Sequence, residues 1–168
     1  LMSDSRITIP RVAAIILAAG QSSRMGEPKA LLPLAARTAL ARVVDSLRSA
    51  GVERMVVVTG YHARSVGPAA ATLGVEIAHN AEPERGMFSS VKTGAAALVA
   101  GADASTAAQD GPPTVRGPWL DAFLVLPVDY PLVPPTVLKA LIGVYATEDC
   151  DVVHPCCAGL RGHPPLLT

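Results

Sequence analysis

Residues 12–29 read Val-Ala-Ala-Ile-Ile-Leu-Ala-Ala-Gly-Gln-Ser-Ser-Arg-Met-Gly-Glu-Pro-Lys. The first six are aliphatic, which is typical of a strand buried on both faces of a parallel sheet. The small residues that follow let backbone N–H groups approach phosphate oxygens, and Gly20 and Gly26 permit the positive φ that a turn requires. Ligands of such sheets lie beyond the carboxyl ends of the strands. The segment therefore predicts a phosphate-binding loop, to which Arg24 and Lys29 add positive charge.

The spacing of the loop residues separates it from two common nucleotide-binding motifs. Neither the Gly-x-x-x-x-Gly-Lys-Ser/Thr pattern of a P-loop nor the Gly-x-Gly-x-x-Gly pattern of a dinucleotide fold follows the strand. The chain carries Ala-Ala-Gly-x-x-x-Arg-Met-Gly-x-x-Lys instead. The plainer alternative is a small-residue turn with two solvated cations. The buried strand directly before the loop favours the anion-binding interpretation.

The composition predicts one α/β domain and limits the kinds of partner. The chain has 168 residues, half of them apolar, which is enough for one buried core. Its 14 positive and 14 negative side chains balance, so no overall field attracts nucleic acid or an anionic membrane. The three cysteines form no even framework and no Cys-x-x-Cys pair, which fits a reducing compartment. We therefore expect a cytoplasmic protein with no nucleic-acid or membrane partner.

Hydrophobic patterning predicts strands that alternate with helices. Helix 62–73 is expected to break near Gly67-Pro68, and residues 101–118, rich in Ala, Gly and Pro, are expected to form a flexible surface loop. The alternation indicates a parallel sheet wrapped by right-handed crossovers. The expected strands are 12–17, 54–59, 75–79, 122–126 and 151–154, and the expected helices are 38–50, 62–73, 89–100 and 134–145.

Small and polar residues follow the second and third predicted strands. Thr59-Gly60 ends the second strand, where a substrate has room to lie against the backbone. Asn80 ends the third, and its amide offers a donor and an acceptor to a nucleobase, although asparagine is also a common turn residue. Gly86 and Ser89-Ser90 then open a helix whose N–H groups, hydroxyls and dipole suit an anion or a base edge. An ordinary serine N-cap is the alternative.

An aspartate follows the fourth predicted strand. Asp129 lies between Pro127 and Pro131 and is well placed to bind a hard divalent cation, magnesium, through oxygen. Such a cation, together with cationic side chains, would stabilise negative charge that develops on phosphate oxygens during a reaction. The alternative is that Asp129 only caps the next helix.

A histidine lies in a rigid bend near the end of the chain. Glycines and prolines flank Arg161-Gly162-His163, which places the histidine and the arginine in an exposed turn. These side chains suit an anionic acceptor, and an incidental turn histidine is the alternative.

Taken in order, these motifs resemble those of the MobA-like nucleotidyltransferases, which move a nucleoside monophosphate from an NTP onto a phosphorylated acceptor. Three of them, 18–20, 86–91 and 162–164, are similar to the molybdenum cofactor cytidylyltransferase branch, and the resemblance covers nearly the whole chain. It implies a Rossmann-like three-layer α/β/α sandwich with a mostly parallel sheet, of the nucleotide-diphospho-sugar transferase type. It also implies transfer of CMP from CTP to the terminal phosphate of molybdopterin, with release of pyrophosphate and no covalent enzyme intermediate.

The resemblance assigns a role to each matching residue. The implied partners are CTP and a phosphorylated pterin acceptor, with a molybdenum hydroxylase as a further candidate. The implied catalytic residues are Arg24, Lys29 and Asp129, of which Asp129 binds Mg²⁺. Nucleotide contacts are implied for Leu17, Ala18, Ala19, Gly20, Ser22, Gly26, Lys29, Thr59, Gly60, Asn80, Gly86, Ser89 and Ser90, and acceptor contacts for Arg161, Gly162 and His163.

The resemblance also raises an expectation about the end of the chain. Family members usually continue beyond Gly-His-Pro to an Asp-x-Asp-x-Pro segment, which supplies a second carboxylate to the metal. The sequence ends at Thr168. We therefore expect a single nucleotidyltransferase domain over residues 1–168 that lacks this segment.

Two other functions remain open. Sugar-1-phosphate nucleotidyltransferases share the glycine-rich loop with its arginine and lysine, but they are normally longer because they carry acceptor-binding insertions. A non-catalytic accessory protein would deliver a pterin cofactor to a molybdenum hydroxylase. It would bind the cofactor without any magnesium-dependent stabilisation by CTP. A dinucleotide-binding oxidoreductase is disfavoured because its fingerprint is missing.

Overall fold

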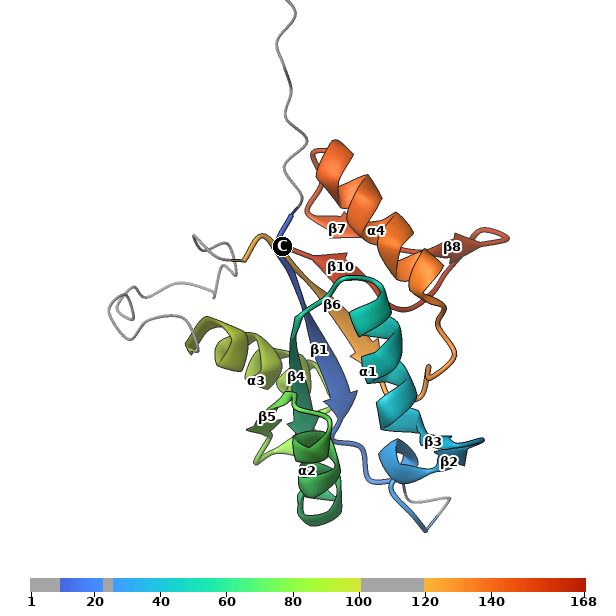
Figure 1. Cartoon of the computed structure of the whole chain (residues 1–168). Coiled ribbons are helices and arrows are strands. Elements are labelled where there is room, and N and C mark those ends of the chain that lie inside the picture. The colour runs from blue at the N-terminus through green and yellow to red at the C-terminus, as the bar shows by residue number, and fades with distance from the viewer. Residues whose placement is uncertain (1–9, 23–25, 101–119) are drawn as a thin grey trace, which may run out of the picture.

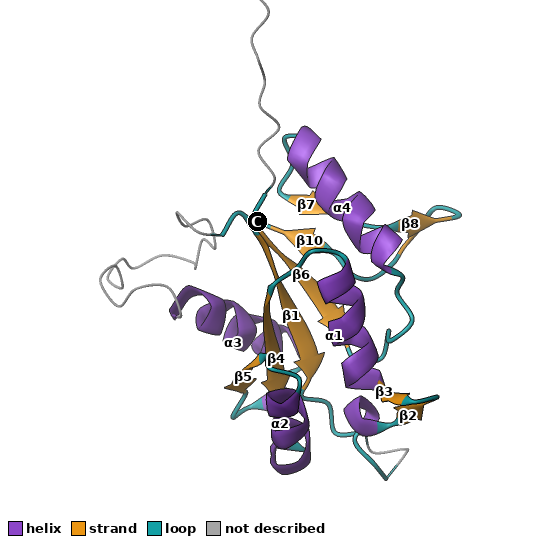
Figure 2. Ribbon diagram, in the orientation of Figure 1, coloured by secondary structure: helices purple, strands orange, loops and turns teal. Residues whose placement is uncertain are grey.

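A six-stranded sheet forms the centre of the molecule (Figures 1 and 2). The computed structural model describes residues 10–22, 26–100 and 120–168, and the sheet order is β5-β4-β1-β6-β10-β7. The first four of these strands are parallel, whereas β10 runs antiparallel to both β6 and β7. The predicted mostly parallel sheet is therefore confirmed. The strands are β1 (Val12–Ala18), β4 (Arg54–Thr59), β5 (Glu76–His79), β6 (Ala122–Pro127), β7 (Val152–Val153) and β10 (Leu166–Leu167).

Helices cover both faces of the sheet. The helices α1 (Ala39–Ser49), α2 (Ala63–Thr72) and α4 (Pro135–Thr147) pack on one face, and α3 (Met87–Ala100) packs on the other (Figure 2). Because successive strand side chains point to opposite faces, Ile16 of β1 belongs to the first core and Ile15 to the second. Both are fully buried. The Rossmann-like three-layer α/β/α sandwich is confirmed.

The ends of two helices can be compared with their sequence signals. Thr38 caps α1, since its side chain accepts a hydrogen bond from Ala41 N at 3.2 Å, and Gly51 follows the helix with φ +90°. The predicted limits of α1 are therefore confirmed to within a residue. The helix α3 begins at Met87, two residues before its predicted start.

The predicted break in α2 is wrong, because the helix runs through Pro68. A proline removes one backbone hydrogen bond from a helix interior and clashes with the preceding turn. Val66 and Ala70 lie on either side of Pro68 and are completely buried against the sheet. This packing offsets the local loss.

Several elements are too short to show a hydrophobic period in the sequence, and they were not predicted. Residues 101–118, predicted as a surface loop, lie outside the described residues. The unpredicted elements are the 3₁₀ turns η1 (Lys29–Leu31) and η2 (Pro83–Arg85), the hairpin of β2 (Pro33–Leu34) and β3 (Arg37–Thr38), the hairpin of β8 (Cys156–Cys157) and β9 (Leu160–Arg161), and β10.

The order of the strands determines where a ligand fits. From β1 the chain passes to β4 and then outward to β5, and it returns across the sheet to β6 on the other side of β1. The strand order thus reverses at β1, and a crevice opens between the carboxyl ends of β1 and β6, where ligands of parallel sheets bind. No described helix has both the length and the apolar composition needed to cross a membrane.

Candidate active site

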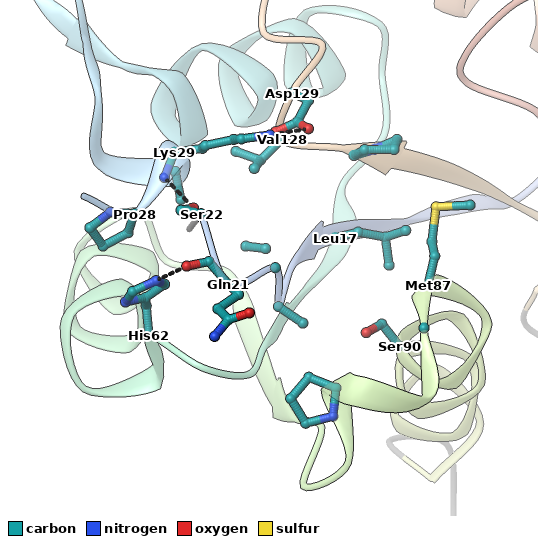
Figure 3. Close-up of a pocket in the computed structure, with 17 residues that line it drawn as sticks. Leu17, Gln21, Ser22, Pro28, Lys29, His62, Met87, Ser90, Val128 and Asp129 are labelled. Atoms are coloured by element: carbon teal, nitrogen blue, oxygen red, sulfur yellow. Dashed lines mark hydrogen bonds and ion pairs between the residues drawn. The ribbon is translucent and has the colours of Figure 1, made fainter. Parts of the chain in front are cut away.

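A cavity of about 340 Å³ opens at this crevice (Figure 3). Its wall comes from the end of β1 and the loop after it, the 3₁₀ turn η2, the start of α3, the end of β6, and one residue before α2. Nine of the sequence-predicted site residues lie in this wall: Leu17, Ala18, Ala19, Gly20, Ser22, Lys29, Gly86, Ser90 and Asp129. The remaining wall residues are Gln21, Pro28, Ala30, His62, Pro83, Met87, Pro127 and Val128.

Hydrogen bonds that involve its backbone hold the loop after β1 in place. Ala19 O accepts a hydrogen bond from Tyr61 N at 3.4 Å, and Gln21 O contacts His62 Nε2 at 2.8 Å. Ser22 has φ +51°, and its Oγ accepts from Lys29 N at 3.2 Å. The small side chains leave the backbone of the loop accessible from the cavity, as a phosphate-binding loop requires. Arg24 lies outside the described residues, and Gly26, with φ +69°, turns the chain outside the cavity wall.

An ion pair joins the two sides of the crevice. Lys29 Nζ donates to Asp129 Oδ2 at 2.8 Å, with the side chains 42% and 47% exposed (Figure 3). An ion pair this accessible to solvent contributes at most about 1 kcal/mol. Because this ion pair is weak, Lys29 can instead bind a polyanion and Asp129 can instead bind a cation.

The start of α3 carries a network of polar side chains centred on Asn80. Asn80 Nδ2 donates to Ser89 Oγ at 2.8 Å and to Ser90 Oγ at 3.0 Å, and Asn80 Oδ1 accepts from Glu82 N at 3.0 Å. Asn80 is only 4% exposed and does not line the cavity. Both amide hydrogens are therefore engaged by the serines, and the contact with a nucleobase stays a prediction. Ser90 and Gly86 reach the cavity, whereas Ser89 Oγ donates to Gly86 O at 2.8 Å.

Thr59 and Gly60 also serve the fold rather than the cavity. Thr59 is 1% exposed, and its hydroxyl donates to Ala78 O at 3.2 Å. A Cβ on Gly60 would lie 2.7 Å from Ala19 O and 3.0 Å from Pro83 Cβ. The loop after β1 therefore fills the space on the Cβ side of Gly60, while Gly60 also lines the neighbouring hollow with His62.

Replacing Gly60 with alanine is expected to displace this loop. The new Cβ would meet backbone and Cβ atoms of Ala19, which have no flexible end to move aside. Overpacking of this kind costs about 1–3 kcal/mol, and we expect a lower urea midpoint. Gly67→Ala is the matched control, because nothing lies within 4 Å of its new Cβ and alanine favours a helix. Equal midpoints for Gly60→Ala and wild type would contradict the packing described here.

None of the predicted acceptor residues lies in the cavity wall. The His163 ring packs on the ring of Tyr130, with centroids 4.8 Å apart, so the fold places His163 against the residue that follows Asp129. His163 Nδ1 is buried and has no hydrogen-bond partner among the described residues. Arg161 and Gly162 are exposed at the β8–β9 hairpin. The structure thus brings His163, but not Arg161, close to the site.

Charge at the cavity is concentrated in few groups. Among the described wall residues, Lys29 is the only lysine or arginine and Asp129 is the only aspartate or glutamate. Across the described ranges, no group of three or more His, Cys, Asp or Glu side chains could hold a metal by itself. Asp129 is thus the one carboxylate among the described wall residues, and a metal bound there would need further ligands from a bound molecule.

Beyond the wall, the Arg85 guanidinium donates to Glu82 at 2.7 Å, and this contact raises the pKa of Arg85 above its usual value.

Sequence reasoning missed His62 and the apolar wall. The apolar members carry no chemistry of their own, so no motif marks them. His62 does carry a signal, because it comes directly after the Thr59-Gly60-Tyr61 turn at the end of β4. Strand ends of this kind face the ligand in α/β sheets.

Among curated proteins, the chain is similar to the bifunctional protein GlmU of two bacteria. It is 34% identical to GlmU of Rhizorhabdus wittichii over 142 residues, which is 83% of this chain and 27% of that protein. It is 32% identical to GlmU of Mycolicibacterium gilvum over 147 residues, which is 83% of this chain and 26% of that protein. The chain thus spans about a quarter of the length of these relatives.

Solved structures share the fold. Rv0371c from Mycobacterium tuberculosis H37Rv matches with a TM-score of 0.71 and 25% identity, over 96% of this chain and 72% of that chain. A nucleotidyl transferase from Methanothermobacter thermautotroptrophicus matches with a TM-score of 0.60 and 28% identity, over 79% and 57%. The model of the MobA-like NTP transferase domain matches residues 14–168, which include every wall residue of the cavity. The chain therefore belongs to the MobA-like NTP transferase domain family of nucleotidyltransferases.

Proposed function

We propose that this chain transfers CMP from CTP to the terminal phosphate of molybdopterin and releases pyrophosphate. The observation that carries the proposal is the cavity at the β1–β6 crevice. On one side lies the loop of small residues after β1 together with Lys29, and Asp129 after β6 faces it from the other side. This arrangement suits a triphosphate, because phosphate oxygens need N–H donors and positive charge while a metal needs a hard oxygen.

The proposed reaction is a direct displacement at phosphorus. An oxygen of the acceptor phosphate attacks the α-phosphorus of CTP and forms the new P–O bond. The bond to the bridging oxygen breaks, and pyrophosphate leaves with the electron pair. The Lys29 ammonium would turn from Asp129 to the phosphates and stabilise the charge that develops there. Arg24, assigned to the same role by the sequence resemblance, would add a second cation.

The proposal includes Mg²⁺, held by Asp129. A single half-exposed carboxylate fits this ion only if phosphate oxygens and waters complete its coordination, which is how magnesium usually binds with nucleotides. When bound, the ion would neutralise phosphate charge and polarise the phosphorus centre. The structure of Rv0371c in complex with manganese supports a divalent cation in this fold at 25% identity.

The acceptor would bind beside Asp129. The rings of Tyr130 and His163, which pack against each other with their planes 33° apart, offer aromatic surface next to this carboxylate, and this surface suits a pterin ring. The product would pass to a molybdenum hydroxylase. A second candidate is transfer to a sugar 1-phosphate, which the 34% identity to GlmU of R. wittichii favours.

Thermal stabilisation by nucleotides is expected to identify the donor. A ligand at 100 times its Kd that binds only the native state adds about 2.7 kcal/mol, which raises Tm by roughly 5–10 °C for a chain of this size. We expect CTP with Mg²⁺ to give the largest shift among the common NTPs, and CTP with EDTA to give a much smaller one.

The same titration separates the alternatives. A preference for UTP, with pyrophosphate release on a sugar 1-phosphate and none on molybdopterin, would favour the second candidate. A Tm that no NTP changes would contradict a nucleotidyltransferase and favour the accessory cofactor-binding role.

A further inference from the structure

We propose that His62 is a positioning residue for the nucleotide-binding loop. Its imidazole holds the carbonyl of Gln21 and thereby orients the backbone that faces the triphosphate. This inference rests on the proposed function, because it concerns how the same cavity receives an NTP. Neither the motifs of the sequence nor the charges of the cavity assign a role to His62.

The contact is direct and joins distant parts of the chain. His62 Nε2 lies 2.8 Å from Gln21 O, across 41 residues of sequence (Figure 3). A carbonyl oxygen can only accept, so Nε2 carries the hydrogen and donates it. His62 and Gln21 both line the cavity. The hydrogen bond therefore connects the start of α2 to the loop after β1 at the cavity wall.

The helix that His62 precedes gains nothing from this side chain. His62 occupies the N-cap position of α2 and makes no side-chain hydrogen bond to the helix. Serine, threonine, aspartate and asparagine are preferred at N-caps because they satisfy a free N–H group. Thr38 does this for α1. The residue before α2 is therefore suited to the loop and not to the stability of its own helix.

Holding the Gln21 carbonyl has a consequence for anion binding. In a trans peptide the C=O and the following N–H point in opposite directions, so fixing Gln21 O also fixes the direction of Ser22 N–H. A free carbonyl beside a triphosphate would repel it. The neighbouring carbonyl of Ala19 is engaged in the same way, by Tyr61 N at 3.4 Å.

The loop needs such external contacts because its own conformation is unfavourable. Ser22 adopts φ +51°, a region that residues other than glycine enter uncommonly. Strained backbone of this kind persists only where its surroundings determine it. His62 is one of the groups that supply this constraint in the described part of the loop.

Replacing His62 with serine tests the proposal, because it should change stability and affinity in opposite directions. Serine is too short to reach Gln21 O but is a preferred N-cap. We expect a Tm at least as high as that of the wild type, together with a Kd for CTP and Mg²⁺ about fivefold weaker, measured by calorimetry. His62→Gln, whose amide can donate at similar reach, should keep an affinity close to that of the wild type.

A matched control lies on the same surface. His79 lines the neighbouring hollow with His62 but not the cavity, and its ring contacts Thr59 Oγ1 at 3.5 Å, so His79→Ser should leave the Kd unchanged. An unchanged Kd in His62→Ser would overturn the inference, as would a loss of affinity that only parallels a loss of Tm. If the wild-type protein binds no NTP at all, the proposed function itself fails, and the two failures are thereby distinguished.

Discussion

Asp129→Asn is expected to lower kcat for pyrophosphate release on the order of 10²–10³-fold while the protein stays folded. The substitution keeps the shape of the side chain but removes the charge that the proposal assigns to the metal. Asp129 is 47% exposed, and its ion pair with Lys29 contributes at most about 1 kcal/mol, so Tm should change little. Steady-state assays of pyrophosphate, with a thermal melt of each sample, measure both quantities.

A second exposed ion pair provides the control. Asp45 accepts from Arg37 at 2.9 Å and 3.0 Å and is 46% exposed, but it does not line the cavity. Asp45→Asn should therefore keep wild-type turnover. Lys29→Ala should resemble Asp129→Asn, because it removes the cation proposed to bind the phosphates. Undiminished turnover in both Lys29→Ala and Asp129→Asn would refute the assignment of the site.

The central elements could be predicted because their signals are local. The predicted second strand, 54–59, coincides with β4, since a run of apolar β-branched residues needs no distant partner to be recognised. The limits of α1 follow from a threonine cap and a glycine stop. Strands and helices that alternate in this way leave few topologies, so the mostly parallel sheet could be predicted from the pattern, whereas the three layers were implied by the family resemblance.

The elements that were missed depend on contacts between distant residues. Leu166–Leu167 forms β10 only because it pairs with Leu124 and Phe123 of β6 on one side and with β7 on the other. Two residues are too few for a hydrophobic period. The continuous α2 likewise reflects burial of Val66 and Ala70, which outweighs the local effect of Pro68.

The candidate site shows the same division. Small residues and carboxylates at strand ends are recognisable, because the carboxyl ends of parallel strands meet at one edge of the sheet. The residues within the chain that these side chains contact cannot be recognised from the sequence. The sequence assigns Lys29 and Asp129, separated by 100 residues, each to a ligand, whereas in the structure they bind each other. Asn80 has the amide of a base-binding residue, but its hydrogen bonds go to the serines that open α3.

Gly94→Val is expected to destabilise the fold by about 3 kcal/mol, near the upper end of the usual range for overpacked cores. Gly94 lies on the face of α3 that packs against the sheet. A Cβ there would fall well inside van der Waals contact with Ile15 Cγ2 and would lie 3.0 Å from Val58 Cγ2. Ile15 is fully buried and branched at Cβ, which restricts its rotamers, so we expect α3 to move away from β1 and β4. Urea denaturation monitored by circular dichroism measures the change.

A control substitution at a helical glycine with free space around it distinguishes this overpacking from the effect that replacing any helical glycine has on stability. Gly143 lies in α4, and nothing is found within 4 Å of the position that a Cβ would take there. Gly143→Ala should therefore stabilise the protein by about 0.4–1 kcal/mol, because it removes conformational freedom from the unfolded chain without strain in the folded one. The two substitutions thus act on stability with opposite signs. A Gly94→Val variant as stable as the wild type would show that α3 does not approach the sheet as closely as the contact with Ile15 requires.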